Sequence, residues 1–193
     1  MTALRSIVLA ASVALAACQS AGPPLRFPEL TFANLPPYQL DVAEIEIKDE
    51  YEPPFKLPNV EHQAPLAPAK AAQRWAQDRL KAVGTNNRAT VRIANAGIVE
   101  NSLRITPGLR GVFTKDQAAR YEATVEIRIE IRNDRGFQDA VAEGHARRSQ
   151  TVPEDISPNA LDQVWYELVE ALMKDVNAEL DKNIPPFMAR FLR

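Results

Sequence analysis

The sequence has one cysteine, Cys18, and only two histidines, His62 and His145, among 193 residues. A lone cysteine cannot form an intramolecular disulfide, so the core has to stabilise the fold. HExxH, CxxC, GxSxG and phosphate-binding glycine motifs are all missing, which removes the usual marks of zinc, acyl-transfer and nucleotide enzymes. The paired acids of a hydrolase can lie anywhere in a sequence. The clustered acids here, however, lie where we expect the solvent-exposed faces of helices and strands. We expect no catalysis, no cofactor and no metal.

The chain also lacks a strong net charge and a long apolar run. Its 23 Lys and Arg oppose 25 Asp and Glu, whereas nucleic-acid binding needs basic residues gathered on one face. We therefore expect no nucleic-acid partner. The longest apolar run, residues 6–17 (SIVLAASVALAA), follows the positively charged Arg5 and is shorter than the roughly 18 residues of a membrane-spanning helix. This arrangement is typical of a secretory signal peptide.

The end of that run, Leu15-Ala16-Ala17-Cys18, resembles the lipobox of bacterial lipoproteins. The resemblance implies cleavage before Cys18, a diacylglyceryl group on its thiol and usually an acyl group on the new amine. Two or more acyl chains hold a protein on a bilayer stably. In enterobacterial sorting, aspartate after the cysteine favours the inner membrane, so Gln19 favours the outer membrane. The alternative is an ordinary signal peptide cut near Ala17, with Cys18 as a free structural thiol.

Prolines divide the rest of the chain, since ten of the 15 lie between Pro23 and Pro68. Proline lacks an amide donor and restricts the residue before it, so this part cannot be a continuous helix. At about 3.1 Å per residue, an extended proline-rich tether would reach on the order of 60 Å from the membrane. We predict four segments: a signal peptide at 1–17, the lipidated cysteine and tether at 18–37, a domain at 38–183 and an apolar, basic tail at 184–193.

The first half of the domain has mixed patterns. Residues 38–48 have strand character, but their apolar residues change phase near residues 42–43, which favours a bulge. Residues 49–65 read as an irregular loop that wraps the domain through its aromatic residues. A helix is expected at about 68–83, because its apolar residues recur at helical spacing and Gly84 follows as a helix end.

Three strands are expected next. Residues 89–100 form a strand that is weakened or bulged around residues 95–97. The clearest strand, 121–132, alternates apolar or small residues with polar and charged residues, which is typical of an antiparallel strand with one wet face. Turn residues at 133–136 then predict a hairpin with a return strand at 137–149.

A long helix follows, with Ser157 as its N-cap and Pro158 in its first turn. Its apolar residues keep a period of 3.6 until Ile-Pro-Pro at 184–186 is expected to stop it. Small residues that share one face of the return strand would let this helix approach closely: Ala140, Ala142, Gly144 and Ala146. The fold class is therefore α+β, a two-layer sandwich with a mainly antiparallel sheet of about four strands packed against two helices.

Two surface features are candidates for binding. Basic residues on or near the hairpin would form a patch for anionic lipid or glycan: Arg128, Arg132, Arg135, Arg147 and Arg148, with Arg110 and Lys115 in the preceding loop. The favoured alternative is cross-strand pairing of these arginines with Glu126, Glu130 and Glu143.

The second feature is the tail, where Phe187 and Phe191 stand four residues apart among basic residues. These phenylalanines either contact lipid or a partner, or they cap the core, which is the favoured alternative.

The chain after Cys18 resembles small envelope lipoproteins of Gram-negative bacteria. Its order of helix, strands, hairpin and helix is loosely similar to auxiliary lipoproteins of ABC-type envelope lipid transport and to the lipopolysaccharide-assembly lipoprotein. The resemblance implies a lipid-anchored, non-catalytic binding or assembly component that faces the periplasm and engages an envelope protein or lipid. An activator or scaffold of a periplasmic cell-wall enzyme is the first alternative, and a hydrolase is a less favoured one.

Overall fold

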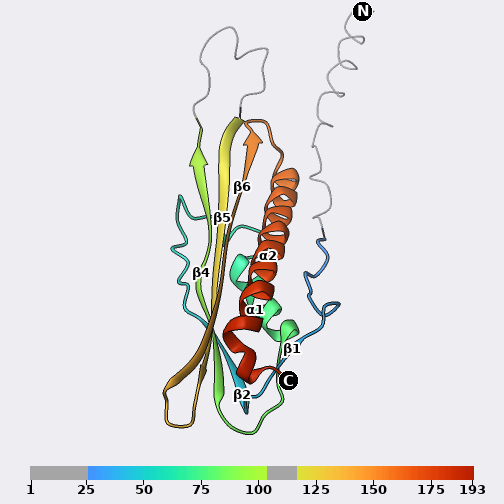
Figure 1. The fold of residues 1–193 in the computed structure, drawn as a ribbon. Helices are drawn as coiled ribbons and strands as arrows, with labels where there is room; N and C mark the ends of the chain where they lie inside the picture. Colours follow the sequence, from blue (N-terminus) through green and yellow to red (C-terminus); the bar gives the residue numbers. More distant parts are fainter. Residues whose placement is uncertain (1–25, 104–116) are drawn as a thin grey trace, which may run out of the picture.

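A computed structural model describes residues 26–103 and 117–193 as two layers. The sheet has the order β2-β4-β5-β6, in which β2 runs parallel to β4 and the other pairs are antiparallel. The helices α1 and α2 pack on one face of it (Figure 1). The bounds are β2 Glu44–Asp49, β4 Arg88–Ser102, β5 Gln117–Arg132, β6 Gln138–Pro153, α1 Pro68–Arg79 and α2 Pro158–Met188. The predicted α+β sandwich is confirmed.

The hairpin of β5 and β6 forms the long axis of the molecule. Each strand has 16 residues, which corresponds to about 50 Å at the usual rise of a strand. In β5 every second residue from Tyr121 to Ile131 is buried, while most residues between them are partly exposed. The predicted alternation is therefore confirmed, and it separates a face covered by helices from a charged open face.

The predicted irregularity in β4 is a change of register between Ile93 and Asn95. The strand continues through it, and Ile93, Ala96 and Ile98 are all buried. One extra residue in one strand is the property of a β-bulge, and it restores the apolar residues to the core face.

The prediction of one bulged strand over 38–48 is wrong, because the chain bends at residues 41–43 and forms two strands. β1 (Tyr38–Leu40) pairs in parallel with β3 (Leu80–Ala82) in a separate small sheet, and β2 joins the main sheet. The bend lets both Leu40 and Val42 lie in the core at 0% exposure.

Residues 80–83 were predicted to be helical, but α1 ends at Arg79 and the chain continues as β3. Gly84 consequently does not end a helix. A Cβ atom at this position would lie 2.3 Å from the Asp41 side chain, and the Gly84 amide donates to the Val42 carbonyl at 3.0 Å. Glycine is required here because two backbone segments approach closely.

The predicted end of the long helix is also wrong. Ser157 caps α2, accepting from the Ala160 amide at 3.3 Å, but the helix continues through Pro185 and Pro186 to Met188. Ile184 and Met188 are buried at 0% and 1% exposure, so packing in the core offsets the hydrogen bonds that the prolines cannot make. α2 thus continues past residue 183, where the domain was predicted to end.

The proline-rich loop between β2 and α1 covers the edge of β4 beyond the end of β2. The Val60 amide donates to the Ile98 carbonyl at 2.9 Å, and the Glu100 amide donates to the Pro58 carbonyl at 2.8 Å. The Ile98 amide donates to the buried Glu61 carboxylate at 3.2 Å. The loop is irregular, as predicted, and it satisfies an edge that would otherwise be open to another strand.

A polar network joins the two helices to β1. The Trp75 indole donates to Asn177 at 2.9 Å, and the Asn177 amide donates to Asp181 at 2.7 Å. Asp181 also accepts from the Tyr38 hydroxyl at 2.7 Å and pairs with the buried Arg79. Burial, followed by the hydrogen bond to Asp181, raises the pKa of Tyr38 to about 12.

Candidate functional site

The predicted lipidation site, Cys18, and the two loop cations of the predicted basic patch, Arg110 and Lys115, lie outside the described residues. The description begins at Arg26, eight residues after Cys18. The segment 26–37, here called the anchor segment, is thus the part of the structure nearest in sequence to the expected membrane attachment.

The anchor segment is packed against the helices and does not form the free tether that was predicted over 18–37. The ring of Phe27 stacks on Tyr166 of α2 with 4.9 Å between centroids. The Tyr166 hydroxyl donates to the Pro28 carbonyl at 2.9 Å, and Phe32 is buried at 5% exposure. Apolar burial explains why these residues leave solvent although they are flanked by prolines.

Polar contacts with α1 hold the same segment. Asp78 accepts from the Phe32 amide and from the Thr31 hydroxyl, both at 2.8 Å. Arg74 pairs with Glu29 at 3.0 Å and with Asp78 at 3.3 Å. Burial alone would raise the pKa of Asp78, but these hydrogen bonds and the charge of Arg74 hold it below its usual value. The anchor segment therefore has a fixed position on the domain.

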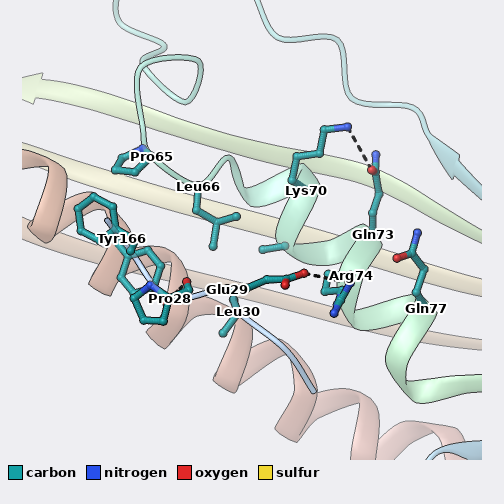
Figure 2. A pocket seen from close by; sticks show the side chains of 12 residues that line it. Pro28, Glu29, Leu30, Pro65, Leu66, Lys70, Gln73, Arg74, Gln77 and Tyr166 are labelled. Carbon is teal, nitrogen blue, oxygen red and sulfur yellow. Dashed lines mark hydrogen bonds and ion pairs between the residues drawn. The ribbon is translucent and has the colours of Figure 1, made fainter. Parts of the chain in front are cut away.

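A groove of about 400 Å³ lies beside the anchor segment, between it, α1 and the end of the proline-rich loop. Figure 2 shows the side chains of Pro65 and Leu66 from the loop, Lys70 and Gln77 from α1, and Tyr166 from α2 around it. We call this the anchor-root groove. Its size is that of a small-molecule or peptide side-chain site.

The chemistry of the anchor-root groove is mixed. Leu30, Leu66 and Tyr166 supply apolar surface, whereas Lys70 and the ion pair of Arg74 with Glu29 supply charge of both signs at its border. Such a surface suits an apolar group that has polar neighbours. The groove was missed from the sequence because its residues come from three distant segments. Phe27, Leu30 and Phe32 were the available signal, since a free tether has no need of large apolar residues close together.

The structure does not join Arg128, Arg132, Arg147 and Arg148 into one free basic patch. Arg128 pairs with Glu130 at 2.7 Å and with Glu143, and Arg132 pairs with Glu130 at 3.1 Å. These residues lie on the open face of the sheet. The favoured alternative, cross-strand pairing of these arginines, holds for Arg128 and Glu143, which lie opposite each other on β5 and β6. Glu130 instead pairs with Arg128 and Arg132 along its own strand.

The other two arginines point to opposite faces. Arg147 pairs with Glu122 at 3.4 Å on the open face, while Arg148 pairs with Asp175 of α2 on the helical face. The hydrogen bond to Asp175 raises the pKa of Arg148, and the same bond lowers the pKa of Asp175. Arg148 thus links the layers and does not contribute to a patch.

Glu130 is the centre of the ionic cluster on the open face. It is only 6% exposed and has Arg92 at 3.7 Å in addition to Arg128 and Arg132. Burial would raise the pKa of Glu130, but the two hydrogen bonds and the surrounding charges hold it below its usual value. This carboxylate is a structural ion-pair partner.

The structure separates the two phenylalanines of the predicted tail. Phe191 is buried at 8% exposure, and its carbonyl accepts from the Asp41 amide at 2.7 Å, so it caps the core. Phe187 is 62% exposed beside Val141, Glu143 and Asn183. Only Phe187 is available for contact with a partner.

A second apolar hollow, of about 200 Å³, lies under the proline-rich loop. Tyr51, Phe55 and His62 line it, with the rings of Phe55 and His62 5.5 Å apart. Burial and a hydrogen bond to Glu61 raise the pKa of Tyr51 to about 12. Phe55 and Leu57 remain 68% and 69% exposed. The aromatic and proline content of residues 49–65 was the signal for this apolar surface.

The histidines and acids form no ligand set in the part of the chain that the structure describes. Within residues 26–103 and 117–193 there is no group of three or more His, Cys, Asp or Glu side chains arranged to hold a metal. His62 and His145 are both exposed, and the His145 amide donates to Glu179 at 3.0 Å. No helix of these two stretches is long and apolar enough to cross a membrane.

No protein-family model and no curated protein matches this chain. Among solved structures, it is similar to the crystal structure of a minor lipoprotein from Acinetobacter baumannii, with 10% sequence identity and a TM-score of 0.34. The match covers 79% of this chain and 96% of that protein. This degree of likeness assigns neither a fold family nor a function.

Proposed function

We propose that the protein is a lipid-anchored, non-catalytic component of the bacterial cell envelope, attached through Cys18 with its domain in the periplasm, the outer membrane being the favoured location. Its task is to bind or assemble with a protein partner near the membrane surface. One observation carries the proposal: the segment that follows the lipobox-like sequence is seated on both helices through Phe27, Phe32 and their contacts.

The fixed anchor segment changes the reach of the domain. Arg26 stands only eight positions after Cys18. That distance corresponds to about 25 Å in polyproline II form, whereas a tether ending at residue 37 would reach on the order of 60 Å. Partners are thus limited to those within a short distance of the bilayer. The anchor-root groove lies beside the anchor segment, so we propose it as the docking surface.

Close packing between the layers favours protein docking over the carriage of lipid. The side chains between sheet and α2, including Ile127, Leu172 and Val176, are at 0% exposure. Acyl chains need an apolar space of their own, and this interlayer region is filled by side chains. A role in envelope lipid transport and a role in activating a cell-wall enzyme would then both depend on protein docking. They would differ in which protein docks.

A hydrolase is less favoured because the most buried carboxylates already have structural partners. Glu61 accepts from the Tyr51 hydroxyl at 3.0 Å and from the Ile98 amide, and Glu130 is surrounded by arginines. Glycoside hydrolysis requires two carboxyl groups that face a substrate from either side of one cleft. These two acids instead hold the loop and the sheet together.

Attachment is tested by the mass of the native protein after gentle extraction from its membrane. We expect loss of residues 1–17 and addition of acyl groups at Cys18. The Cys18→Ala variant should be exported but unlipidated, and it should move from the detergent phase to the aqueous phase. Unchanged membrane retention of Cys18→Ala would contradict the lipid anchor.

Docking is tested by a photoreactive residue at Gln77, which is exposed in the anchor-root groove, and by a matched one at Gln138, which is exposed on β6. We expect a specific protein crosslink from position 77 in intact cells, and none from position 138. A transporter subunit or a cell-wall enzyme in that crosslink would distinguish the two roles. Crosslinks to lipid alone would contradict protein docking.

A further inference from the structure

A third cavity, with a polar lining, lies at the end of the sheet where β5 turns into β6, which is the lower end in Figure 1. Its volume is about 560 Å³. The start of β2, the turn between β3 and β4 and the turn between β5 and β6 meet around it. We call it the polar cup, lined chiefly by Glu44, Asn86, Arg88, Arg132, Asn133 and Asp134.

Hydrogen bonds hold the three turns of the polar cup in place. The Ala43 amide donates to the Asn86 carbonyl at 2.9 Å, and the Asn87 amide donates to the Asp134 carboxylate at 3.1 Å. Asn87 has a positive φ of 64°, a conformation that asparagine tolerates better than most residues. The shape of the cup is therefore established before any ligand binds, which lowers the entropic cost of binding.

Several polar groups of the cup have unused hydrogen-bonding capacity. The Asn133 Oδ1 accepts from the Arg135 and Phe137 amides at 3.0 and 3.1 Å, which leaves its Nδ2. Within the described residues, the side chains of Thr85 and Asn86 make no hydrogen bond. These groups combine donors and acceptors in one concave surface, as hydroxyl groups require, because each hydroxyl both donates and accepts.

The lining of the polar cup has no excess of either charge, since it contains two arginines and two carboxylates, Glu44 and Asp134. Arg88 pairs with Glu44 through its Nε. Arg132 donates to the Gly136 carbonyl at 3.2 Å and pairs with Glu130, outside the cup, at 3.1 Å. A strongly anionic ligand would be repelled by the two carboxylates, and a strongly cationic ligand would be repelled by the two arginines. The lining therefore fits an uncharged polar ligand.

An exposed aromatic residue follows one of the cup-lining turns in the sequence. Phe137 follows Gly136, which lines the cavity, and its side chain is 67% exposed. Its backbone is fixed, because the Asn133 amide donates to the Phe137 carbonyl at 3.0 Å. An exposed ring one residue from a polar cavity is a source of the apolar surface that the C–H face of a sugar covers.

We propose that the polar cup binds a neutral, hydroxyl-rich glycan, with Asn86 and Asn133 hydrogen-bonding its hydroxyl groups and Phe137 packing against a sugar face. The cavity volume is sufficient for one or two sugar rings. The site lies away from the anchor-root groove and does not depend on the function proposed for that groove.

The test uses the full mature protein in a zwitterionic detergent that contains no sugar. Triacetylchitotriose and maltotriose are the neutral probes, and a sulfated oligosaccharide is the anionic probe, each titrated by calorimetry and by saturation-transfer NMR. We expect saturable binding of at least one neutral probe at millimolar or lower concentration. Asn86→Ala should weaken that binding by about threefold to tenfold, the usual effect of a lost hydrogen bond.

Two matched controls separate the cup from the rest of the surface. Phe137→Ser should also weaken binding, whereas Phe187→Ser should not, although both phenylalanines are exposed to a similar extent. Asn101→Ala, at the exposed other end of β4, should match the parent protein. Absence of neutral-probe binding, tighter binding of the sulfated probe, or equal weakening by the cup variants and the controls would overturn the proposal.

Discussion

Gly144 of β6 lies directly against Leu180 of α2, so that a Cβ atom added at Gly144 would come 2.5 Å from Leu180 Cγ. Real Cβ atoms do not approach another carbon so closely. Because Gly144 has no side chain, α2 can lie this near to β6. The row of small residues at 140–146 thereby sets the separation of the two layers, as expected from the sequence.

Gly144→Ala should lower the free energy of unfolding by about 1–3 kcal/mol, because overpacking displaces Leu180. Urea unfolding of the unlipidated Cys18→Ala protein measures this change. Leu180→Ala alone should cost about 2–5 kcal/mol by leaving a cavity. In that background the added methyl group of Gly144→Ala has room and should cost much less. An equal cost in both backgrounds would show that another contact is responsible.

The two phenylalanines at the C-terminus should respond differently to truncation. Phe191→Ala removes a buried ring that covers the core near β1 and should cost about 3 kcal/mol. Phe187→Ala changes an exposed ring and should stay within about 0.5 kcal/mol of the parent protein. Thermal or urea unfolding of both variants tests the assignment, and similar losses would contradict it.

The ionic cluster around Glu130 should make stability depend on pH in acid. Because its pKa is held below the usual value of about 4.3, the folded state gains stability above that value and loses it as the pH falls through the folded pKa. Glu130→Gln should be less stable at neutral pH and should lose less stability between about pH 5 and pH 3. The free energy of unfolding is measured by urea at each pH in this range. If it changes with pH equally in Glu130→Gln and in the parent protein, the assignment is contradicted.

The anchor segment should come off the helices when its aromatic contact is removed. Phe27→Ser loses the stacking on Tyr166, and the amides of residues 29–33 should then exchange hydrogen faster, while those of β5 should not change. Tyr166→Phe keeps the ring and removes only the bond to the Pro28 carbonyl, so its effect should be smaller. Exchange measured by mass spectrometry distinguishes these outcomes, and parent-like protection in Phe27→Ser would contradict the stated contact.

Features that depend on neighbouring residues were predictable from the sequence. The alternation along β5 and the helical period of α2 are patterns within one segment of the sequence. Each pattern predicts which face of that strand or helix is buried. The irregularity of β4 was detectable for a similar reason, since residues 95–97, which include a glycine, interrupt the strand pattern locally. The sequence alone also determines the signal-like run and Leu15–Cys18, on which the proposed membrane attachment depends.

Tertiary contacts decided the features that local patterns predicted wrongly. α1 ends at Arg79 because residues 80–82 pair with a strand about 40 positions earlier, and α2 passes two prolines because Ile184 and Met188 are buried. The anchor segment leaves solvent only because Tyr166 and Asp78 receive it. The anchor-root groove and the polar cup likewise join residues from distant segments. Burial free energy depends on which surfaces meet, and the sequence of one segment does not contain that information.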